Sequence, residues 1–318
     1  MNPQHVPVVS VITPTFNRGH LLHRAWQSLQ HQNVPFEWII VDDGSQDDTT
    51  VVVDSFGDTR ISLITFPVNR GVNSARNAGV RQAHGQYVVF LDSDDELCIG
   101  ALEAAVAAFL TAPVDVGAIL MRAEIFGTRM PVSPLKHGVI LDEYAIVCQG
   151  APHGECGVMY RIEVFSFQML PEDLRGCEQV FVYGIARRYK YLCIDIPFRI
   201  LHRQSDNLSH AASIIDRSLD IALSYERILI NHAAILRNDN HAAIGYAHKA
   251  LYRYLIAGQY SAAFRVYRQI CGRTISLHAK VVLTVVGVAG LVFRCGPERL
   301  RLRYMVWRIQ RPTRETLC

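Results

Sequence analysis

The chain has 318 residues, half of them hydrophobic, and a net charge of +3. This length and apolar content suffice for one large domain with a smaller appendage and argue against a disordered chain. Its eight cysteines form no Cys-x-x-Cys pair, which speaks against zinc and disulfide frameworks and for a reducing, cytoplasmic compartment. No basic region followed by a long apolar one opens the sequence, so we expect no signal peptide.

Apolar strand patterns alternate with helical patterns in the N-terminal half. Strands are predicted at residues 8–12, 36–41, 60–66 and 86–91, and a helix follows each of the first three. Near-continuous apolar strands separated by helices are typical of a mostly parallel sheet that helices cover on both faces. The sequence therefore predicts a Rossmann-like α/β domain.

Polar and aromatic residues gather where these strands end. They are Pro14, Phe16, Asp42, Asp43, Arg76, Asn77, Asp92 and Asp94. In open parallel sheets, ligands bind outside the carboxyl ends of the strands, so we expect these residues to converge on one site. The residue types suit a nucleotide diphosphate: a ring at Phe16 can cover a base, and Asp43 can accept hydrogen bonds from a base or ribose. Phe16 as a core ring and Asp42 as the cap of a turn are the alternatives.

The fourth strand runs into three aspartates and a glutamate within residues 92–96. Such like charges raise one another's pKa unless a cation or solvent relieves the repulsion. Asp92 and Asp94 can hold a hard divalent cation through oxygen. The alternative is a solvated turn that ends the strand, since aspartate is common in turns.

Four motifs in order resemble family 2 glycosyltransferases of the GT-A fold. They are SVITPTFNR at 10–18, IIVDDGSQD at 39–47, NRGVNSARNAG at 69–79 and FLDSDD at 90–95. The resemblance covers about residues 8–210. It implies a GT-A nucleotide-sugar-binding fold and an inverting enzyme. Such an enzyme moves a sugar from a nucleotide-diphosphate donor to an acceptor hydroxyl with the help of Mg²⁺ or Mn²⁺.

The same resemblance implies a role for each motif. Pro14, Phe16 and Asp43 would surround the nucleobase, with Arg76 nearby. Asp92 and Asp94 would form the Asp-x-Asp pair that meets the ribose and the diphosphate-bound metal, with Asp94 as the main metal ligand. For Arg76 the alternative is an ordinary arginine on a helix surface.

Inversion by direct displacement also needs a carboxylate that takes the proton of the acceptor hydroxyl. The family usually supplies it from a Glu-Asp pair at the start of a helix, and the corresponding pair here reads Glu178-Gln179. Because a glutamine cannot act as a base, Glu178 is the predicted catalytic residue. Glu172 and Asp173 are the fallbacks, and a helix-capping role is the alternative for Glu178.

A second departure from the family concerns histidines. Relatives carry an Arg-x-His-like pattern where this chain has His202-Arg203-Gln204. His202 and Arg203 could approach the diphosphate, and a structural histidine is the alternative for His202. His153 and Glu155 lie in a loop that could contact the acceptor.

The C-terminal part has helical spacing of apolar residues at 216–230 and 240–257, followed by a predicted turn at Gly258. We therefore divide the chain into a GT-A catalytic domain (1–210), a helical extension (211–278) and a tail (279–318). The extension would pack on the catalytic domain or mediate oligomer contacts.

The tail joins an apolar segment, 279–293, to a basic one. Residues 294–318 contain seven arginines and two glutamates, a net charge of +5. This pairing suits peripheral binding to an anionic membrane surface, while a core helix with a solvated basic tail is the alternative. The apolar segment is too short to span a bilayer. No recognised nucleic-acid-binding module accompanies the charge, so nucleic acid is not an expected partner.

Two functions are compatible with these patterns. The first is a metal-dependent glycosyltransferase that uses a nucleotide-diphosphate sugar, with a UDP-sugar as the expected donor. Its acceptor would be a glycan or a lipid-linked precursor of a surface polysaccharide. The second is a catalytically impaired protein of the same fold that acts as a binding or assembly partner, as Gln179 would suggest. The lack of a glycine-rich phosphate loop speaks against phosphoryl transfer.

Overall fold

The computed structural model describes residues 6–128, 131–132, 135–152, 154–202 and 215–271. Its N-terminal part follows the predicted alternation of strands and helices. The elements are β1 (Val9–Thr15), η1 (Gly19–Leu21), α1 (Leu22–Leu29), β2 (Phe36–Asp42), α2 (Thr49–Ser55), β3 (Ile61–Thr65), α3 (Val72–Gln82) and β4 (Tyr87–Phe90). All four predicted strands and the helices between them are confirmed.

The rest of the α/β domain adds shorter elements around two long strands. They are β5 (Glu96–Leu97), α4 (Ala101–Thr111), β6 (Val116–Ile125), β7 (Ile140–Leu141), α5 (Glu143–Val147), β8 (Cys156–Arg161), α6 (Val164–Phe167), α7 (Gln179–Ala186) and β9 (Lys190–Leu201). The C-terminal helices are α9 (Ser218–Asn231), α10 (Ala233–Leu236), α11 (Asn240–Ile256) and α12 (Tyr260–Cys271). Both predicted C-terminal helices are confirmed, as is the turn at Gly258 that precedes α12.

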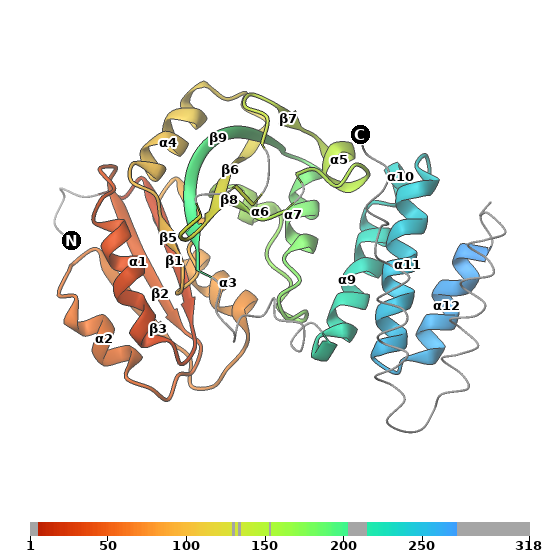
Figure 1. Cartoon of the computed structure of the whole chain (residues 1–318), viewed down its shortest axis with the longest axis horizontal. Coiled ribbons are helices and arrows are strands. Elements are labelled where there is room, and N and C mark those ends of the chain that lie inside the picture. Colours follow the sequence, from red (N-terminus) through yellow and green to blue (C-terminus); the bar gives the residue numbers. More distant parts are fainter. Residues whose placement is uncertain (1–5, 129–130, 133–134, 153, 203–214, 272–318) are drawn as a thin grey trace.

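One sheet organises the α/β domain (Figure 1). The strand order in the described residues is β3-β2-β1-β4-β8-β6-β9-β5, with β7 paired to β9. Strands β1 to β4 run parallel, as predicted, and β6 pairs with β9 in parallel. The antiparallel strand β8 lies between β4 and β6. The carboxyl ends of β1, β2 and β4 therefore lie at one edge of the sheet.

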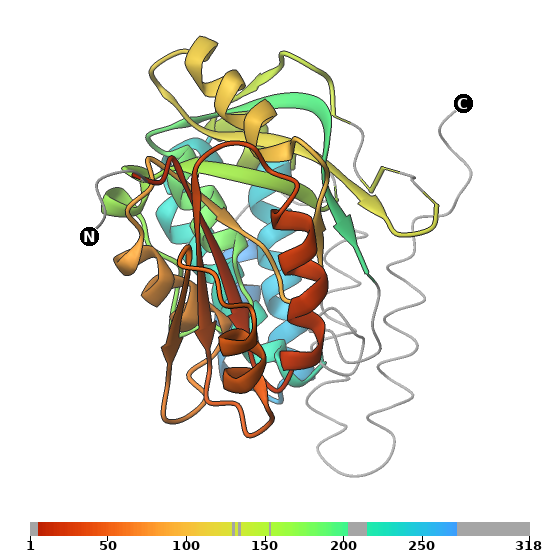
Figure 2. The same ribbon diagram turned by 90° about the vertical axis from the view of Figure 1, so that its left-hand side faces the viewer.

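Apolar side chains cover both faces of the sheet. On one face, the fully buried Trp38 stacks on Trp26 of α1, with ring centroids 5.6 Å apart. The indole N–H of Trp38 donates a 2.8 Å hydrogen bond to the Thr13 hydroxyl, so its polar atom is satisfied inside the core. Helices α3, α6 and α7 contribute to the core on the other face. Helix α1 and the C-terminal helices lie on opposite sides of the sheet (Figures 1 and 2).

The core of the sheet continues into the helical extension. Ile228 of α9, Leu236 of α10 and Tyr246 of α11 belong to the same buried cluster as Phe181 of α7. Helix α11 lies between α9 and α12 (Figure 1). The predicted division near residue 210 falls in 203–214, outside the described residues, as does the predicted tail at 279–318. In the described part, no helix has the length and hydropathy needed to cross a membrane.

Helix α3 packs closely against β1 at Gly79. A Cβ there would collide with the side chain of Ile12, which is fully buried. We expect Gly79→Ala to lower the free energy of unfolding by about 1–3 kcal/mol, the usual cost of overpacking a core. Gly245→Ala in α11 is the matched control, because nothing lies near its Cβ position. Alanine should stabilise that helix by about 1 kcal/mol. Denaturant unfolding measures the free energy of unfolding of both variants. A Gly79→Ala variant as stable as the wild type would contradict this packing.

Candidate active site

The ends of β1, β2 and β4 bring the predicted site segments to one edge of the sheet. In the strand register, Thr15 lies opposite Asp42, and Ile12 lies between Ile39 and Phe90. The backbone N–H of Asp43 donates to the carbonyl oxygen of Thr15 at 2.8 Å, which extends this pairing beyond β2.

The loop after β1 leaves Phe16 accessible. Phe16 is 43% exposed, so the alternative of a core ring is wrong. The next residue, Asn17, has a φ of 53° and receives the backbone N–H of Gln46 on its Oδ1 at 2.8 Å. Its own N–H donates to the Ser45 hydroxyl at 2.8 Å. These bonds tie the loop to the one after β2, while Pro14 lies partly buried near the end of β1.

Asp43 lies buried after β2 and organises a third loop. Its two carboxylate oxygens accept the backbone N–H groups of Arg70 at 2.7 Å and Gly71 at 2.8 Å. Burial nevertheless raises the pKa of Asp43, although these two N–H groups act in the opposite direction. Asp42 accepts the N–H of Ser45 at 2.9 Å, so the proposed turn cap exists. The role of Asp43 toward a base or ribose stays a prediction.

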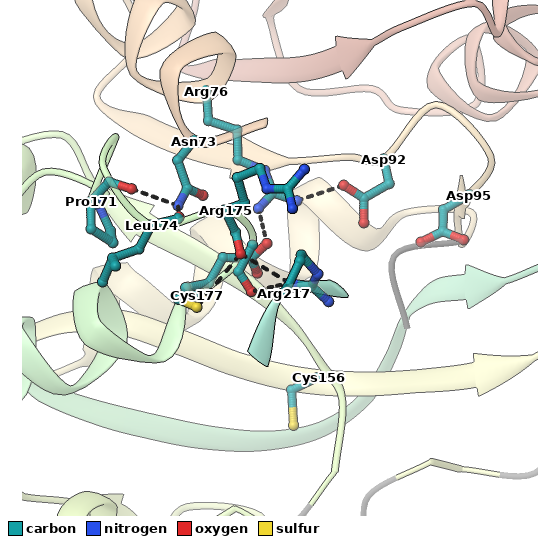
Figure 3. A network of polar contacts seen from close by, with 12 residues as sticks. Asn73, Arg76, Asp92, Asp95, Cys156, Pro171, Leu174, Arg175, Cys177 and Arg217 are labelled. Atoms are coloured by element: carbon teal, nitrogen blue, oxygen red, sulfur yellow. Dashed lines mark hydrogen bonds and ion pairs between the residues drawn. The ribbon is translucent and has the colours of Figure 1, made fainter. Parts of the chain in front are cut away.

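Arg76 is a buried link between two acids. Its Nη2 donates to Asp92 Oδ1 at 2.6 Å, and its Nη1 pairs with Glu178 (Figure 3). The arginine side chain is only 7% exposed and packs over the Phe90 ring. Burial lowers its pKa, but Glu178 and Asp92 more than compensate and raise the pKa above the usual arginine value. The alternative of an ordinary surface arginine is therefore wrong.

The three aspartates after β4 differ in the direction in which their pKa is shifted. Burial raises the pKa of Asp92, but Arg76 and Arg199 overcome this effect and hold it below its usual value. For Asp94, burial and the neighbouring Asp92 raise the pKa. Burial raises the pKa of Asp95 to about 8. Arginine neighbours thus outweigh burial at Asp92, while burial outweighs them at Asp94 and Asp95.

Three further arginines surround the aspartates, and the sequence patterns assigned no role to them. Arg18 pairs with Asp94 at 3.4 Å, and Arg24 donates to the backbone carbonyl of Asp94 at 2.5 Å. Arg199 of β9 lies 3.5 Å from both Asp92 and Asp95. Its sequence signal is an arginine inside the apolar stretch 196–201 at the end of that strand, because a buried strand accepts a charge only when the charge has a partner.

The three candidate bases have different partners. Glu172 accepts hydrogen bonds from Ser74, Asn77 and Arg81, and although burial raises its pKa, these bonds lower it overall. Asp173 forms a two-pronged pair with Arg227, which lowers its pKa. Of the three, only Glu178 is linked to the aspartate cluster, through Arg76, and its side chain is 47% exposed.

Gln179, the residue that replaces the acid expected in the family, turns away from the cluster. Its Nε2 donates to the hydroxyl of Ser224 in α9 at 3.0 Å. Gln179 opens α7, and Glu178 occupies the N-cap position of that helix without a side-chain capping bond. Glu178 thus has the position of a cap, while its side chain pairs with Arg76 and makes no capping hydrogen bond.

His202 is held by protein groups on all sides. Its Nε2 lies 2.6 Å from Glu96, its Nδ1 lies 3.2 Å from Arg24, and its backbone N–H donates to Asp95 at 3.2 Å. Phe126 stacks on its ring. This environment fits the structural alternative for His202. Glu155 is exposed, while Arg203 and His153 lie outside the described residues.

The raised pKa of Asp95 makes stability depend on pH. A carboxyl group whose folded-state pKa lies above its unfolded value stabilises fully below the unfolded pKa, 3.8, and loses that contribution as pH rises through about 8. In metal-free buffer we expect the melting temperature to fall between about pH 4 and pH 8. Asp95→Asn should flatten this fall, because an amide does not ionise. A variant whose melting temperature falls as steeply as that of the wild type would contradict the assignment.

Comparison with known proteins places this geometry in a family. The model of glycosyl transferase family 2 matches residues 10–157, the segment that carries all four strand-end motifs. These residues form a family 2 glycosyltransferase domain. The GT-A fold and the family resemblance seen in the sequence are both confirmed.

Curated relatives match the glycosyltransferase domain over a limited stretch. A GalNAc(5)-diNAcBac-PP-undecaprenol beta-1,3-glucosyltransferase of Campylobacter jejuni is 46% identical over 101 residues, which cover 30% of this chain and 33% of that protein. The Escherichia coli enzyme WfgD, a UDP-Glc:alpha-D-GlcNAc-diphosphoundecaprenol beta-1,3-glucosyltransferase, is 35% identical over 104 residues. That match covers 32% of this chain and 41% of WfgD. The matched stretch thus spans about a third of the length of the first relative.

Solved structures resemble this chain over a longer stretch. TarS residues 1–349 of S. aureus, solved with UDP-GlcNAc, has a TM-score of 0.59 and 21% identity. The match covers 82% of this chain and 90% of that one. The mannosyltransferase PcManGT of Pyrobaculum calidifontis, solved with GDP-Man and Mn²⁺, has a TM-score of 0.54 and 18% identity, and covers 96% of this chain and 86% of that one. At these identities the likeness concerns the fold.

The aspartates of the glycosyltransferase domain offer carboxylate oxygens, the ligand type that Mg²⁺ and Mn²⁺ prefer. The Asp94 side chain is 7% exposed, and its raised pKa reflects negative charge that a cation would relieve. Among the described residues, no group of three or more His, Cys, Asp or Glu side chains is arranged to hold a metal by itself. Mg²⁺ commonly binds through one or two carboxylates and completes its shell with substrate phosphates and water. A donor diphosphate would supply those ligands here.

Proposed function

We propose that this chain is an inverting glycosyltransferase that moves a sugar from a nucleoside-diphosphate donor to a hydroxyl group of its acceptor. The observation that carries the proposal is the link from Asp92 through the buried Arg76 to Glu178. It joins a positive charge and an exposed carboxylate beside the strand ends. Displacement of a diphosphate by a hydroxyl needs both, because the leaving group gains charge while the nucleophile loses a proton.

The donor would lie along the strand ends with its base near Pro14, Phe16 and Asp43. The exposed Phe16 ring supports this placement, since bases stack on accessible aromatic side chains. At the other end, the Nε atoms of Arg76 and Arg199 are buried and have no hydrogen-bond partner in the described structure. Buried donors normally have partners, so an anionic group such as a diphosphate would complete this end of the site.

In the proposed reaction, Glu178 accepts the proton of the acceptor hydroxyl as that oxygen bonds to the anomeric carbon of the donor sugar. The bond from this carbon to the diphosphate oxygen breaks, and its electron pair leaves with the nucleoside diphosphate. Attack opposite the leaving group inverts the anomeric configuration. Asp94, together with Asp92, would hold a Mg²⁺ or Mn²⁺ ion that neutralises charge on the diphosphate.

For the substrates, we propose a UDP-sugar and a glycan or lipid-linked acceptor. Two relatives are named as glucosyltransferases with diphosphoundecaprenol-linked substrates, one of them with UDP-Glc, and one structural neighbour holds UDP-GlcNAc. Surface polysaccharide synthesis and peripheral contact with a membrane would suit such an acceptor. The basic tail that would make this contact, residues 279–318, lies outside the described residues.

The second candidate, an impaired protein that only binds, rests on Gln179. The hydrogen bond from Gln179 to Ser224 gives that glutamine a structural role, and Glu178 remains available as the base. A binding protein would retain affinity for sugar nucleotides and never release nucleoside diphosphate.

One assay separates the two functions. Purified protein is incubated with a panel of UDP- and GDP-sugars, Mn²⁺ or Mg²⁺, and lipid-linked or oligosaccharide acceptors, and nucleoside diphosphate release is measured. The enzyme predicts release with at least one donor, dependent on acceptor. Donor binding by calorimetry without release across the panel would favour the binding protein. A protein that binds none of the donors and releases no nucleoside diphosphate would contradict the proposal.

A further inference from the structure

Helix α9 directs a polar stripe at the segment that carries Glu178. The stripe consists of Arg217, just before the helix, and Asp220, Ser224 and Arg227 within it. Their spacing of three, four and three residues places them on one face of a helix. Each of these four side chains contacts a residue within 173–179.

Arg217 contributes two hydrogen bonds from a buried charged side chain to the stripe. This arginine is 7% exposed, and its Nη1 donates to the backbone carbonyl oxygens of Arg175 at 3.0 Å and Gly176 at 3.1 Å (Figure 3). Hydrogen bonds from an ionised donor are stronger than neutral ones, more so when buried. They hold the backbone two and three residues before Glu178.

The remaining contacts hold the segment on both sides of Glu178. Directly after it, Gln179 donates to the fully buried Ser224 hydroxyl at 3.0 Å. Before it, Asp173 receives both Nη atoms of Arg227, at 3.0 and 2.6 Å. The Nε of Arg175 also lies 3.5 Å from Asp220. Glu178 is thus flanked by contacts to one helix.

Helix α3 holds the same segment from the opposite side. Its Asn73 donates to the carbonyl oxygens of Pro171 and Leu174, both at 2.8 Å, and its Arg76 pairs with Glu178 itself. Gly176 has a φ of 59°, in the left-handed region, and lies two residues before Glu178. The position of Glu178 relative to Asp92 therefore depends on α3 and α9 together.

We propose that the polar stripe of α9 is a brace that positions Glu178 for proton removal, which makes the helical extension part of the catalytic machinery. Arg217 and Ser224 are its main positioning residues. The inference rests on the proposed role of Glu178. The contacts that the stripe makes with residues 173–179 lie on the base segment, away from the strand ends where the donor would bind. Loss of the stripe should therefore lower kcat and leave the KM for the donor unchanged.

The test compares Arg217→Ala and Ser224→Ala with Arg265→Ala. Arg265 of α12 is the matched control because it is exposed and pairs with Glu226, which lies on α9 like the stripe. We expect kcat to fall about tenfold or more in the two brace variants, as small misplacements of catalytic groups are costly. The donor KM should stay within about twofold. Arg217→Lys should recover much of kcat, because an ammonium can donate to both carbonyl oxygens.

A second readout does not depend on activity. Trypsin cleaves after Arg175, whose side chain is 65% exposed and whose carbonyl oxygen Arg217 holds. Cleavage at this bond, identified by mass spectrometry of the fragments, should be several times faster in Arg217→Ala than in Arg265→Ala. Ser224→Ala keeps the buried arginine, so it supplies the result if Arg217→Ala does not fold.

The outcomes separate the brace from the proposed function. A wild type without turnover would contradict the function, and the cleavage rates would still decide whether α9 holds the segment. An active wild type whose Ser224→Ala and Arg217→Ala variants keep its kcat and its cleavage rate would overturn the brace. A fall in kcat that equals the fall in Arg265→Ala, or a rise in donor KM alone, would overturn it as well.

Discussion

Glu178→Gln is expected to lower kcat by about a hundred- to ten-thousandfold, the range that a positioned general base contributes. Glutamine keeps the size of the side chain and can still accept the hydrogen bond from Arg76. Its amide cannot take the acceptor's proton, so donor affinity should stay near the wild-type value while turnover is lost. Steady-state kinetics together with calorimetric titration of the nucleoside diphosphate measure both quantities.

The control for this variant is Glu172→Gln. Glu172 anchors the start of the base segment through Ser74, Asn77 and Arg81, so the variant should lower the melting temperature and change kcat only a few-fold. A wild-type kcat in Glu178→Gln, combined with a large loss in Glu172→Gln, would move the base to Glu172. Gln179→Asp should not raise kcat, because that side chain faces Ser224.

Asp94→Asn is expected to lower kcat by about a hundred- to a thousandfold, the usual cost of losing one group that stabilises charge in a transition state. It should also abolish the stimulation by Mn²⁺ or Mg²⁺, since the variant loses the proposed main metal ligand. Because burial and Asp92 raise the pKa of Asp94, its ionised form is penalised in the folded protein. We therefore expect the melting temperature at neutral pH to stay the same or rise, while activity falls.

The control for Asp94 is Asp115→Asn. Asp115 precedes β6 and pairs with Lys190 near the surface, so its loss should change neither kcat nor the metal response. Titration with Mn²⁺ and nucleoside diphosphate, followed by thermal shift, gives the second readout. An Asp94→Asn variant stabilised by the metal as strongly as the wild type would show that the ion binds elsewhere.

Much of the fold was predictable because its signals are local. Each strand from β1 to β4 is a mostly apolar run of the kind that parallel strands need, and turn residues such as Asn69 to Gly71 mark the ends. The position of β8 between β4 and β6 was not predictable, because pairing partners far apart in sequence leave no local pattern.

The site was predictable only on the side built from consecutive motifs. Asp92 and Arg76 belong to such motifs, but Arg199 reaches Asp92 from β9, 107 positions away. The identity of the base could not be settled from residues 172–179 alone. Three acids occur in this segment, and their partners on α3 and α9 decide which one faces Asp92.

The most direct test is a crystal structure of the protein with a nucleoside diphosphate and Mn²⁺. We predict the base beside Phe16 and Asp43, the diphosphate and the ion at Asp92 and Asp94, and the Glu178 carboxylate facing the space that the donor sugar would occupy. A nucleotide bound away from these strand ends, or a Glu178 carboxylate directed away from the diphosphate, would contradict the proposed active site.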